Sequence, residues 1–267
     1  MTNIKDAVVP AGKKRGNRSA KRFIWAMLIV ALFLPSGVMA QQTDTVGIFY
    51  NLIPSQYKPY AVALGQRLRK SGKERITAKG YLAYSDNLDE PQPVEIIWQY
   101  PLKVLLTQGD FSQAYDMTTA SFKAPADPML ADTVEVLLGD SAEGLLSMCS
   151  TTGRTRYIGS GFVLPRTDIK GSGIDIVQMT IDDAFQDGRT VVKSYWFNSV
   201  TKLLGFVGYQ TASGNQVDVI IDDWQDVGGE KVPFLIERWE NGKLVLRFTL
   251  ASATVAAAAN DGTFGGK

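Results

Sequence analysis

Carboxylates are the side chains whose spacing in this chain first suggests chemistry. Asp182-Asp183 and Asp222-Asp223 are adjacent pairs, and each follows a strand-like run, "IVQMTIDD" or "VDVIIDD". Paired carboxylates can bind calcium or serve as the acid and base of a glycosidase. Neither pair lies in a D-x-D-x-D-G loop that ends in glutamate, and acids commonly end a strand and start a turn. We therefore expect both pairs to mark turns; the alternative is that the two pairs converge on a sugar.

The composition excludes several classes of catalyst. The 267 residues include no histidine, which removes Ser-His-Asp and Cys-His catalysis and histidine-ligated zinc. With a single cysteine, Cys149, the chain can form neither an internal disulfide nor a thiolate cluster for a metal. Cys149 lies in the helix-like stretch "AEGLLSMCS", and we interpret it as a small buried hydrophobic residue. We predict no catalytic residue, no metal site and no cofactor, and hence a protein that is not an enzyme.

A predicted β-hairpin carries the strongest candidate for a binding surface. Asn241-Gly242 separates two strand-like runs, and both residues accept the positive φ of a two-residue type I′ turn. With that loop Glu240 pairs with Lys243, which places Glu237 opposite Leu246. One face of the hairpin is then apolar apart from a single acid. We predict that this face lines a ligand-binding cavity through Leu235, Glu237, Trp239, Leu244, Leu246, Phe248 and Leu250.

This apolar face is unfavourable to leave in water. Each large apolar side chain gains roughly 1.5–3 kcal/mol when something dry covers it. One interpretation is that the protein's own helices cover the face completely and that Glu237 pairs with an arginine of a neighbouring strand. The other is that the few predicted helices leave part of the concavity open, as a lipid-sized pocket. In a cavity Glu237 would need a basic partner or a proton.

The first 40 residues have the pattern of an export signal. Six basic residues between positions 13 and 22 precede an uncharged run from Phe23 to Leu34. Pro35-Ser36-Gly37 breaks the run, and Val38-Met39-Ala40 has small residues where a signal peptidase cleaves. We predict a signal peptide over 1–40, cleaved after Ala40, and a periplasmic protein; the alternative is an uncleaved inner-membrane anchor. Glutamine, not cysteine, follows Ala40, so we expect no lipid anchor and only transient membrane contact.

The predicted mature chain is mildly acidic. Seven of the 28 basic residues and one of the 27 acidic residues precede position 41, so 21 basic and 26 acidic residues remain, a net charge of −5. Such a chain lacks the basic surface that nucleic acid requires. We therefore predict no nucleic-acid partner.

The elements predict a mainly β domain with a few helices, of the α+β class. Helical spacing of apolar residues from 57 to 70 predicts a helix that Ser71-Gly72 ends. Asp127-Pro128, and Asp140 with Glu143, have the patterns of two further helix starts, the second a capping box. We assign residues 41–255 to one domain and 256–267 to a flexible tail. Four strands precede the middle helices and seven follow, at about 155–165, 173–181, 190–197, 203–210, 216–222, 232–240 and 243–254.

Three segments carry a resemblance to a known family. "GYLAYSDNLDEPQPVEIIWQYPLKVLLTQG" contains Gln99-Tyr100-Pro101-Leu102-Lys103, which is similar to a Q-x-P-x-K element of the outer-membrane lipoprotein-sorting (LolA/LolB-like) family. Asn198 in "YWFNSVTKLLGFVGYQ" stands where that family often has aspartate, and Trp224 in "DDWQDVGGEKVPFLIERWENGK" stands where it usually has tyrosine. The resemblance covers nearly all of the predicted mature chain. It implies an unclosed antiparallel β-barrel of about eleven strands, short helices as a lid, and an apolar cavity that accepts acyl chains.

Two functional hypotheses follow from the apolar hairpin and the resemblance. The first is a soluble periplasmic binding protein for acyl chains, either a lipoprotein carrier or a lipid-binding relative, that sequesters apolar chains in the barrel concavity. The second is an envelope regulatory or protein-interaction module that binds a partner peptide without catalysis, for instance along an edge strand. The predicted partners are therefore acyl chains or lipoproteins, and envelope proteins.

Overall fold

Alternation of apolar and polar side chains gives the described part of the chain eleven strands, each antiparallel to its neighbours. The computed structural model describes residues 50–66, 68, 74–100, 102–119, 121–149, 154–162, 173–257 and 263–264, all of them within one unit, Asp44–Lys267. The strands are β1 (Glu74–Tyr84), β2 (Gln92–Gln99), β3 (Lys103–Gln108), β4 (Phe111–Asp116), β5 (Arg154–Phe162), β6 (Ile174–Asp183), β7 (Arg189–Asn198), β8 (Leu204–Gln210), β9 (Gln216–Val227), β10 (Glu230–Glu240) and β11 (Lys243–Ala257).

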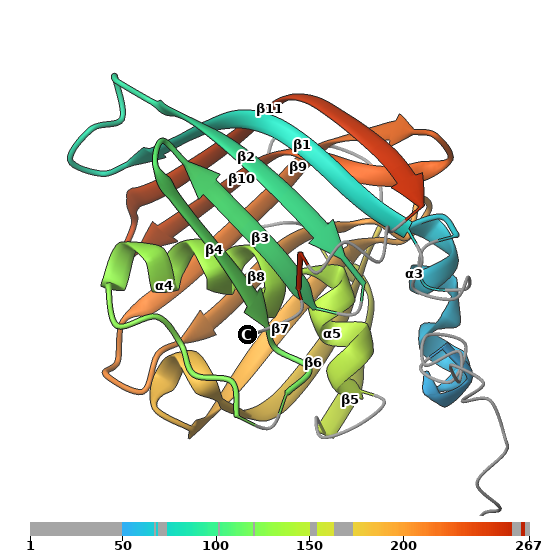
Figure 1. The fold of residues 1–267 in the computed structure, drawn as a ribbon. Helices are drawn as coiled ribbons and strands as arrows, with labels where there is room; N and C mark the ends of the chain where they lie inside the picture. Colours follow the sequence, from blue (N-terminus) through green and yellow to red (C-terminus); the bar gives the residue numbers. More distant parts are fainter. Residues whose placement is uncertain are drawn as a thin grey trace, which may run out of the picture. The chain divides into compact units, whose positions relative to one another are not determined.

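A single sheet contains all of these strands, in the order β4-β3-β2-β1-β11-β10-β9-β8-β7-β6-β5 (Figure 1). Consecutive strands pair within β1–β4 and within β5–β11, and β1 pairs with β11 to join the two halves. β4 and β5 are the two edges and do not pair with each other, so the sheet is not closed. The predicted class is confirmed: a mainly β, unclosed antiparallel barrel of eleven strands with a few short helices.

Short α-helices accompany the sheet, among them α3 (Lys58–Ala63), α4 (Pro128–Val134) and α5 (Ala142–Cys149). A 3-10 turn, η1 (Ser55–Tyr57), precedes α3, and another, η3 (Ala184–Gln186), links β6 to β7. A π-helical turn, η2 (Glu135–Gly139), continues α4 toward α5. We call α4, η2 and α5 the lid helices, because Figure 1 shows them within the curve of the sheet. No helix in the described part of the chain has the length and apolar character needed to cross a bilayer.

The sequence signals located one helix start correctly and two helix boundaries wrongly. Asp127 caps α4 as predicted, with its Oδ1 accepting a hydrogen bond from Leu130 N at 2.9 Å. The cap of α5 is Ser141, whose Oγ accepts from Gly144 N at 2.9 Å; Asp140 is engaged in buried ion pairs instead. The first helix ends at Ala63 rather than near residue 70. The chain leaves the helix because Gly65 has φ +109° and Gln66 N donates to Glu230 Oε1 at 2.8 Å.

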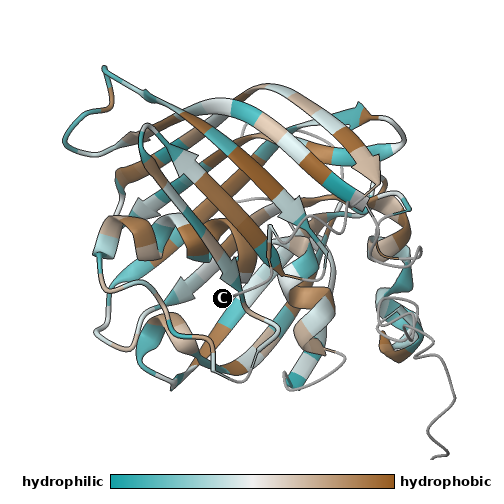
Figure 2. Cartoon of the chain, viewed as in Figure 1, coloured by the Kyte–Doolittle hydropathy of each residue, from teal (hydrophilic) through white to brown (hydrophobic). Residues whose placement is uncertain are grey.

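The main hydrophobic core lies between the inner face of the sheet and the lid helices. Figure 2 shows hydrophobic residues recurring along β2 and β3 and on α4. Val134, Leu138 and Leu146 from the lid helices belong to the same buried cluster as inward-facing strand residues such as Ile96 and Phe248. The lid helices therefore cover this inner face. The void that remains beside them measures about 70 Å³, which is smaller than the lipid-sized pocket of the second interpretation.

The hairpin around Asn241-Gly242 forms as predicted at its turn but not beyond it. Asn241 and Gly242 have φ +46° and +83°, and Glu240 pairs with Lys243. A β-bulge then shifts the register between Arg238 and Trp239, so that Glu237 pairs with Arg247 and not with Leu246. Val245 is the extra residue, so the predicted face changes side along β11, between Leu244 and Leu246, because a shift of one residue exchanges the two faces of a strand. The side chains that β10 buries include Val232, Phe234, Ile236 and Arg238.

The two aspartate pairs lie apart. Asp182-Asp183 ends β6 as expected, and Asp183 Oδ1 accepts a hydrogen bond from Phe185 N at 2.9 Å in the following turn. Asp222-Asp223 does not end its strand: β9 continues to Val227, with Asp223 at φ +50°. Strands β7 and β8 separate β6 from β9, so the pairs are on the order of 14 Å apart or more. The structure does not bring them together at one site.

Two predicted segments lie wholly or mostly outside the described residues. The signal peptide predicted over 1–40 falls outside the described residues, and so does most of the tail predicted over 256–267. Ala256 and Ala257 belong to β11, so the strand ends two residues beyond the domain end predicted at 255. Cleavage after Ala40 stays a prediction.

Candidate functional site

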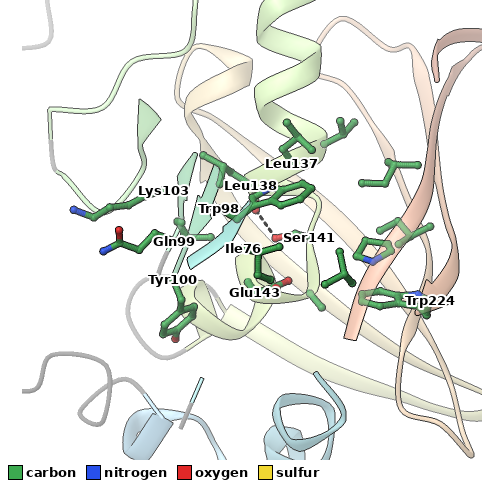
Figure 3. A pocket seen from close by; sticks show the side chains of 17 residues that line it. Ile76, Trp98, Gln99, Tyr100, Lys103, Leu137, Leu138, Ser141, Glu143 and Trp224 are labelled. Atoms are coloured by element: carbon green, nitrogen blue, oxygen red, sulfur yellow. Dashed lines mark hydrogen bonds between the residues drawn. The ribbon is translucent and has the colours of Figure 1, made fainter. Parts of the chain in front are cut away.

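An apolar pocket lies between the lid helices and the sheet, and encloses a void of about 70 Å³. Figure 3 shows Ile76, Trp98, Leu137 and Leu138 gathered at its centre, with Trp224 across from them. The lining combines residues of β1, β2, β3, β9 and β10 with the β2–β3 link, η2 and the start of α5: Ile76, Trp98, Gln99, Tyr100, Leu102, Lys103, Val136, Leu137, Leu138, Ser141, Ala142, Glu143, Ile221, Trp224, Val232, Pro233 and Ile236.

Strand pairing and the π-helical turn position the apolar walls. Ile76 and Trp98 are opposite one another in β1 and β2, and Ile221 and Ile236 are opposite one another in β9 and β10. Both pairs therefore present neighbouring side chains to one face of the sheet. η2 supplies three consecutive apolar residues, 136–138, that are all buried. Consecutive residues point in different directions around a helix, so a single turn of lid contacts several walls of the pocket.

Three of the polar side chains that line the pocket are already hydrogen-bonded or paired. Lys103 Nζ lies 2.8 Å from Asp116 Oδ2, and Figure 3 shows Lys103 pointing away from the cavity. Trp224 Nε1 donates to Leu204 O at 2.8 Å, and Ser141 Oγ donates to Leu138 O at 2.8 Å. The pocket therefore suits an apolar guest, since a polar guest would find few partners inside.

Beside this pocket, a buried lysine fixes the lid helices to the sheet. The Lys193 side chain on β7 has no exposed surface. Its Nζ lies 2.7 Å from Glu135 Oε1, 2.8 Å from Asp140 Oδ1 and 2.8 Å from Asp183 Oδ2. Glu135 and Asp140 begin and follow η2, so the lysine holds both ends of that turn.

A buried arginine provides the second attachment. Arg238 on β10 places Nη1 2.9 Å from Glu135 Oε2, and Nη2 3.2 Å from Asp132 Oδ1 on α4. Nη2 also lies 2.8 Å from Glu240 Oε1, at the edge of the cluster. Tyr209 Oη accepts from Arg238 Nη1 at 3.1 Å, and so joins β8 to the same network. We call Asp132, Glu135, Asp140, Asp183, Lys193, Tyr209 and Arg238 the ion network.

Burial and mutual attraction set the ionisation of this network. Burial raises the pKa of Asp140 to about 7, although Lys193 opposes the shift. Burial acts to lower the pKa of Lys193, but Asp140 and Glu135 outweigh it and hold that pKa well above its usual value. Burial also acts to raise the pKa of Glu135, but Lys193 and Arg238 outweigh it and lower that pKa. The network therefore retains two cations and a Glu135 carboxylate at neutral pH, while Asp140 titrates near neutrality.

Sequence reasoning missed this network, although one signal was present. Lys193 occupies an inward position of β7 between Val191 and Tyr195, where the alternation of the strand requires a buried side chain. A lysine at such a position needs buried carboxylates. Arg238 gave no comparable signal, because the regular register predicted for the hairpin placed it on the face opposite the apolar one.

The seven predicted ligand-binding residues separate into two groups. Leu246, Phe248 and Leu250 on β11 are buried in the main core. Leu235, Glu237, Trp239 and Leu244 are partly exposed, and Glu237 Oε1 accepts from Arg247 Nε at 2.7 Å. Glu237 thus has a basic partner, but at the partly exposed side of β10. None of the seven lines the apolar pocket, and contact of any of them with a ligand stays a prediction.

Cys149 is partly buried at the end of α5, in agreement with its interpretation as a packing residue. Its Sγ donates to Leu146 O at 3.2 Å. Burial raises the pKa of the thiol to about 12, which leaves very little of the reactive thiolate at neutral pH.

Comparison with known proteins was informative only at the level of structure. No family model and no curated protein matches the sequence. An outer membrane lipoprotein-sorting protein domain from Vibrio parahaemolyticus is 7% identical, with 84% of this chain and 97% of that chain covered and a TM-score of 0.51. This chain has that fold. The resemblance to lipoprotein-sorting proteins expected from the sequence is therefore confirmed in the fold.

Two further structures are more distant. The LolA superfamily protein NE2245 from Nitrosomonas europaea is 11% identical, with 76% of this chain and 96% of that chain covered and a TM-score of 0.43. The complex of MucA and MucB from Pseudomonas aeruginosa contains a chain that is 8% identical, with 80% of this chain and 62% of that chain covered and a TM-score of 0.23.

Proposed function

We propose that this protein binds acyl chains of lipids or lipoproteins in the apolar pocket beneath the lid helices, and acts without catalysis. The observation that carries the proposal is an apolar cavity enclosed by the sheet and by η2 and α5. The lipoprotein-sorting fold supports the same class of ligand. The protein then serves as a lipoprotein carrier or as a lipid-binding relative, located in the periplasm after cleavage of the predicted signal peptide.

The size of the void requires the lid helices to move when a chain enters. Ligand pockets usually measure about 300–1,000 Å³, whereas this void is about 70 Å³. Each methylene that enters gains roughly 0.8 kcal/mol. Several methylenes can therefore offset the cost of displacing packed lid residues such as Leu137 and Leu138, which line the void. Binding then depends on how firmly the ion network holds η2.

The test uses a fluorescent fatty acid and native mass spectrometry of the purified protein. We expect acyl-bearing species to co-purify, and we expect Ala142→Leu, which fills the void, to weaken fatty-acid binding by about tenfold or more. The matched control is Ala114→Leu, at an exposed position of β4, which should bind as the wild type does. If neither co-purified acyl chains nor fatty-acid binding is observed, the proposal is wrong.

The second candidate function is capture of a partner peptide along an edge of the sheet. β4 is an edge strand whose six residues pair with β3 in regular register, and Phe111 is 38% exposed. β5, the other edge, has two register shifts, which disfavour an added strand. A photo-crosslinker at Gln113 would distinguish the functions, because a peptide partner should be trapped there even after delipidation, whereas acyl binding predicts no adduct.

A further inference from the structure

A second hollow, polar in character, lies away from the apolar pocket, between the first helix and the β5–β8 end of the sheet. It measures about 600 Å³, and none of its lining residues lines the apolar pocket. Tyr60 of α3, Tyr157 of β5, Asp175 of β6 and Lys202 of the β7–β8 turn converge on it, beside Ser160 and Ser199. We call this hollow the polar cleft.

One buried carboxylate organises the cleft. The Asp175 side chain is 5% exposed. Its Oδ2 accepts from Lys202 Nζ at 2.7 Å and from Tyr60 Oη at 3.1 Å, and its Oδ1 accepts from Tyr157 Oη at 3.3 Å. Burial and the nearby Asp175 raise the pKa of Tyr60, so its phenol stays protonated and donates. Four segments far apart in the sequence are thus fixed to one another through a single side chain.

The lysine is held in place by its own turn. Lys202 has φ +61°, and its N donates to Asn198 O at 2.8 Å. Asn198 Oδ1 accepts from Val200 N and Thr201 N, both at 2.9 Å. Ser199 N donates to Gly173 O at 2.8 Å, which ties the turn to the start of β6. Because the turn is fixed at so many points, little conformational entropy is lost when the Lys202 ammonium contacts a ligand.

The cleft offers donors and acceptors side by side. Both phenols give their protons to Asp175, so their oxygens face a ligand as acceptors. An ammonium has three donors, and Lys202 uses one of them on Asp175 while its side chain remains 33% exposed. The hydroxyls of Ser160 and Ser199 can serve either way. A ligand with adjacent hydroxyl groups, each both donor and acceptor, matches this set.

The charge of the cleft and the exposed Tyr157 ring further restrict the chemical class of the ligand. Asp175 already neutralises Lys202 at 2.7 Å, and an anion bound at the ammonium would lie close to a buried carboxylate, which repels it. Tyr157 is 47% exposed at the cleft, so its ring can pack against the apolar face of a sugar. We propose that the polar cleft binds a neutral saccharide, independently of acyl-chain binding.

The cleft binds the saccharide and does not cleave it. Glycoside hydrolysis uses two carboxyl groups on either side of the scissile bond. Among the described residues that line the cleft, Asp175 is the sole carboxylate, and it accepts three hydrogen bonds. A carboxylate in that state lacks the partner and the free oxygen that the reaction requires.

The experiment titrates the purified protein with maltotriose and with triacetylchitotriose, using saturation-transfer and amide-shift NMR. We expect at least one sugar to bind, and Tyr157→Ala to weaken it by about tenfold or more, since aromatic residues in pockets carry much of the binding energy. Ser160→Trp, which obstructs the cleft without removing a partner of Asp175, should abolish binding. The matched control is Tyr81→Ala, which removes a tyrosine that is 48% exposed on β1 and should leave binding unchanged.

Three results would overturn the proposal: no binding of either sugar, equal binding by wild type, Tyr157→Ala and Ser160→Trp, or a preference for inorganic phosphate in the same cleft. Ala142→Leu separates this inference from the proposed function, because it should weaken fatty-acid binding and leave sugar binding intact. If the wild type binds fatty acid but neither sugar, the assignment of the polar cleft is wrong. If it binds a sugar but no fatty acid, the assignment of the apolar pocket is wrong.

Discussion

Replacing Lys193 with methionine tests whether the ion network holds the lid helices to the sheet. Methionine is close to lysine in length and occupies the same buried position, but it removes the positive charge. Glu135, Asp140 and Asp183, now 2.7–2.8 Å from Lys193 Nζ, all lose that partner. Glu135 keeps its ion pair with Arg238. Among the ion pairs of the described residues, Asp183 is paired with Lys193 alone.

The expected loss of stability is large. Removing one member of a buried ion pair typically costs 3–5 kcal/mol, because a charge is left buried without compensation. The Lys193 side chain has no exposed surface, so water cannot substitute for it. For a domain of about 200 residues, each kcal/mol shifts the melting temperature by roughly 2–4 °C. The variant should therefore melt about 6–20 °C below the wild type.

Urea unfolding at pH 7.5 and pH 5 measures the effect. We expect a deficit of 3–5 kcal/mol at pH 7.5 that becomes smaller at pH 5, because carboxylates without a cation take up protons more readily. The matched control is Lys79→Met. Its ion pair with Glu95 spans 3.5 Å at the surface, with 68% of the lysine side chain exposed, and its loss should change stability by less than about 1 kcal/mol. A deficit under about 1 kcal/mol for Lys193→Met would refute the anchoring role.

Three further outcomes can be checked. The raised pKa of Asp140, about 7 against its usual 3.8, adds stability that is complete below about pH 4 and is lost as pH rises through 7; Asp140→Asn should remove this slope in urea unfolding from pH 4 to 8. With a pKa of about 12 against 9.0, the Cys149 thiol should react with iodoacetamide about 1,000-fold more slowly than a free thiol at pH 8, and mass spectrometry should show normal reactivity after unfolding. Asp127→Ala should cost about 1 kcal/mol by removing the α4 cap; a thermal melt indistinguishable from wild type would contradict that role.

The sequence predicted the strands well because their signals are local. Alternation over six or more residues identifies a strand without knowledge of its partner, and Asn241-Gly242 specified a turn that needs positive φ at both positions. The same is true of Asp127, whose capping role depends only on the three residues that follow. These predictions rested on chemistry contained within a few neighbouring positions.

The candidate site was predicted less well because it depends on long-range geometry. One bulge between Arg238 and Trp239 moved Glu237 beside Arg247, and no residue type in the hairpin announces a bulge there. Asp140 was expected to cap a helix because Glu143 follows it, yet Lys193, 53 positions away in sequence, takes its carboxylate. The apolar pocket likewise combines β1, β2, β9 and β10 with the lid helices, an assembly that local patterns do not specify.

The seam between β1 and β11 has a consequence for how the chain is made. Glu74 pairs with Ala257, and Tyr84 with Leu246, so among the described strands the first in sequence pairs with the last. This seam joins the two halves of the sheet, and it cannot form until nearly the whole polypeptide has left the ribosome. Pairing over such a separation in sequence is slow to form. For the export predicted from residues 1–40, this arrangement favours a precursor that crosses the membrane unfolded, because the two halves of the sheet join only after β11 has been synthesised.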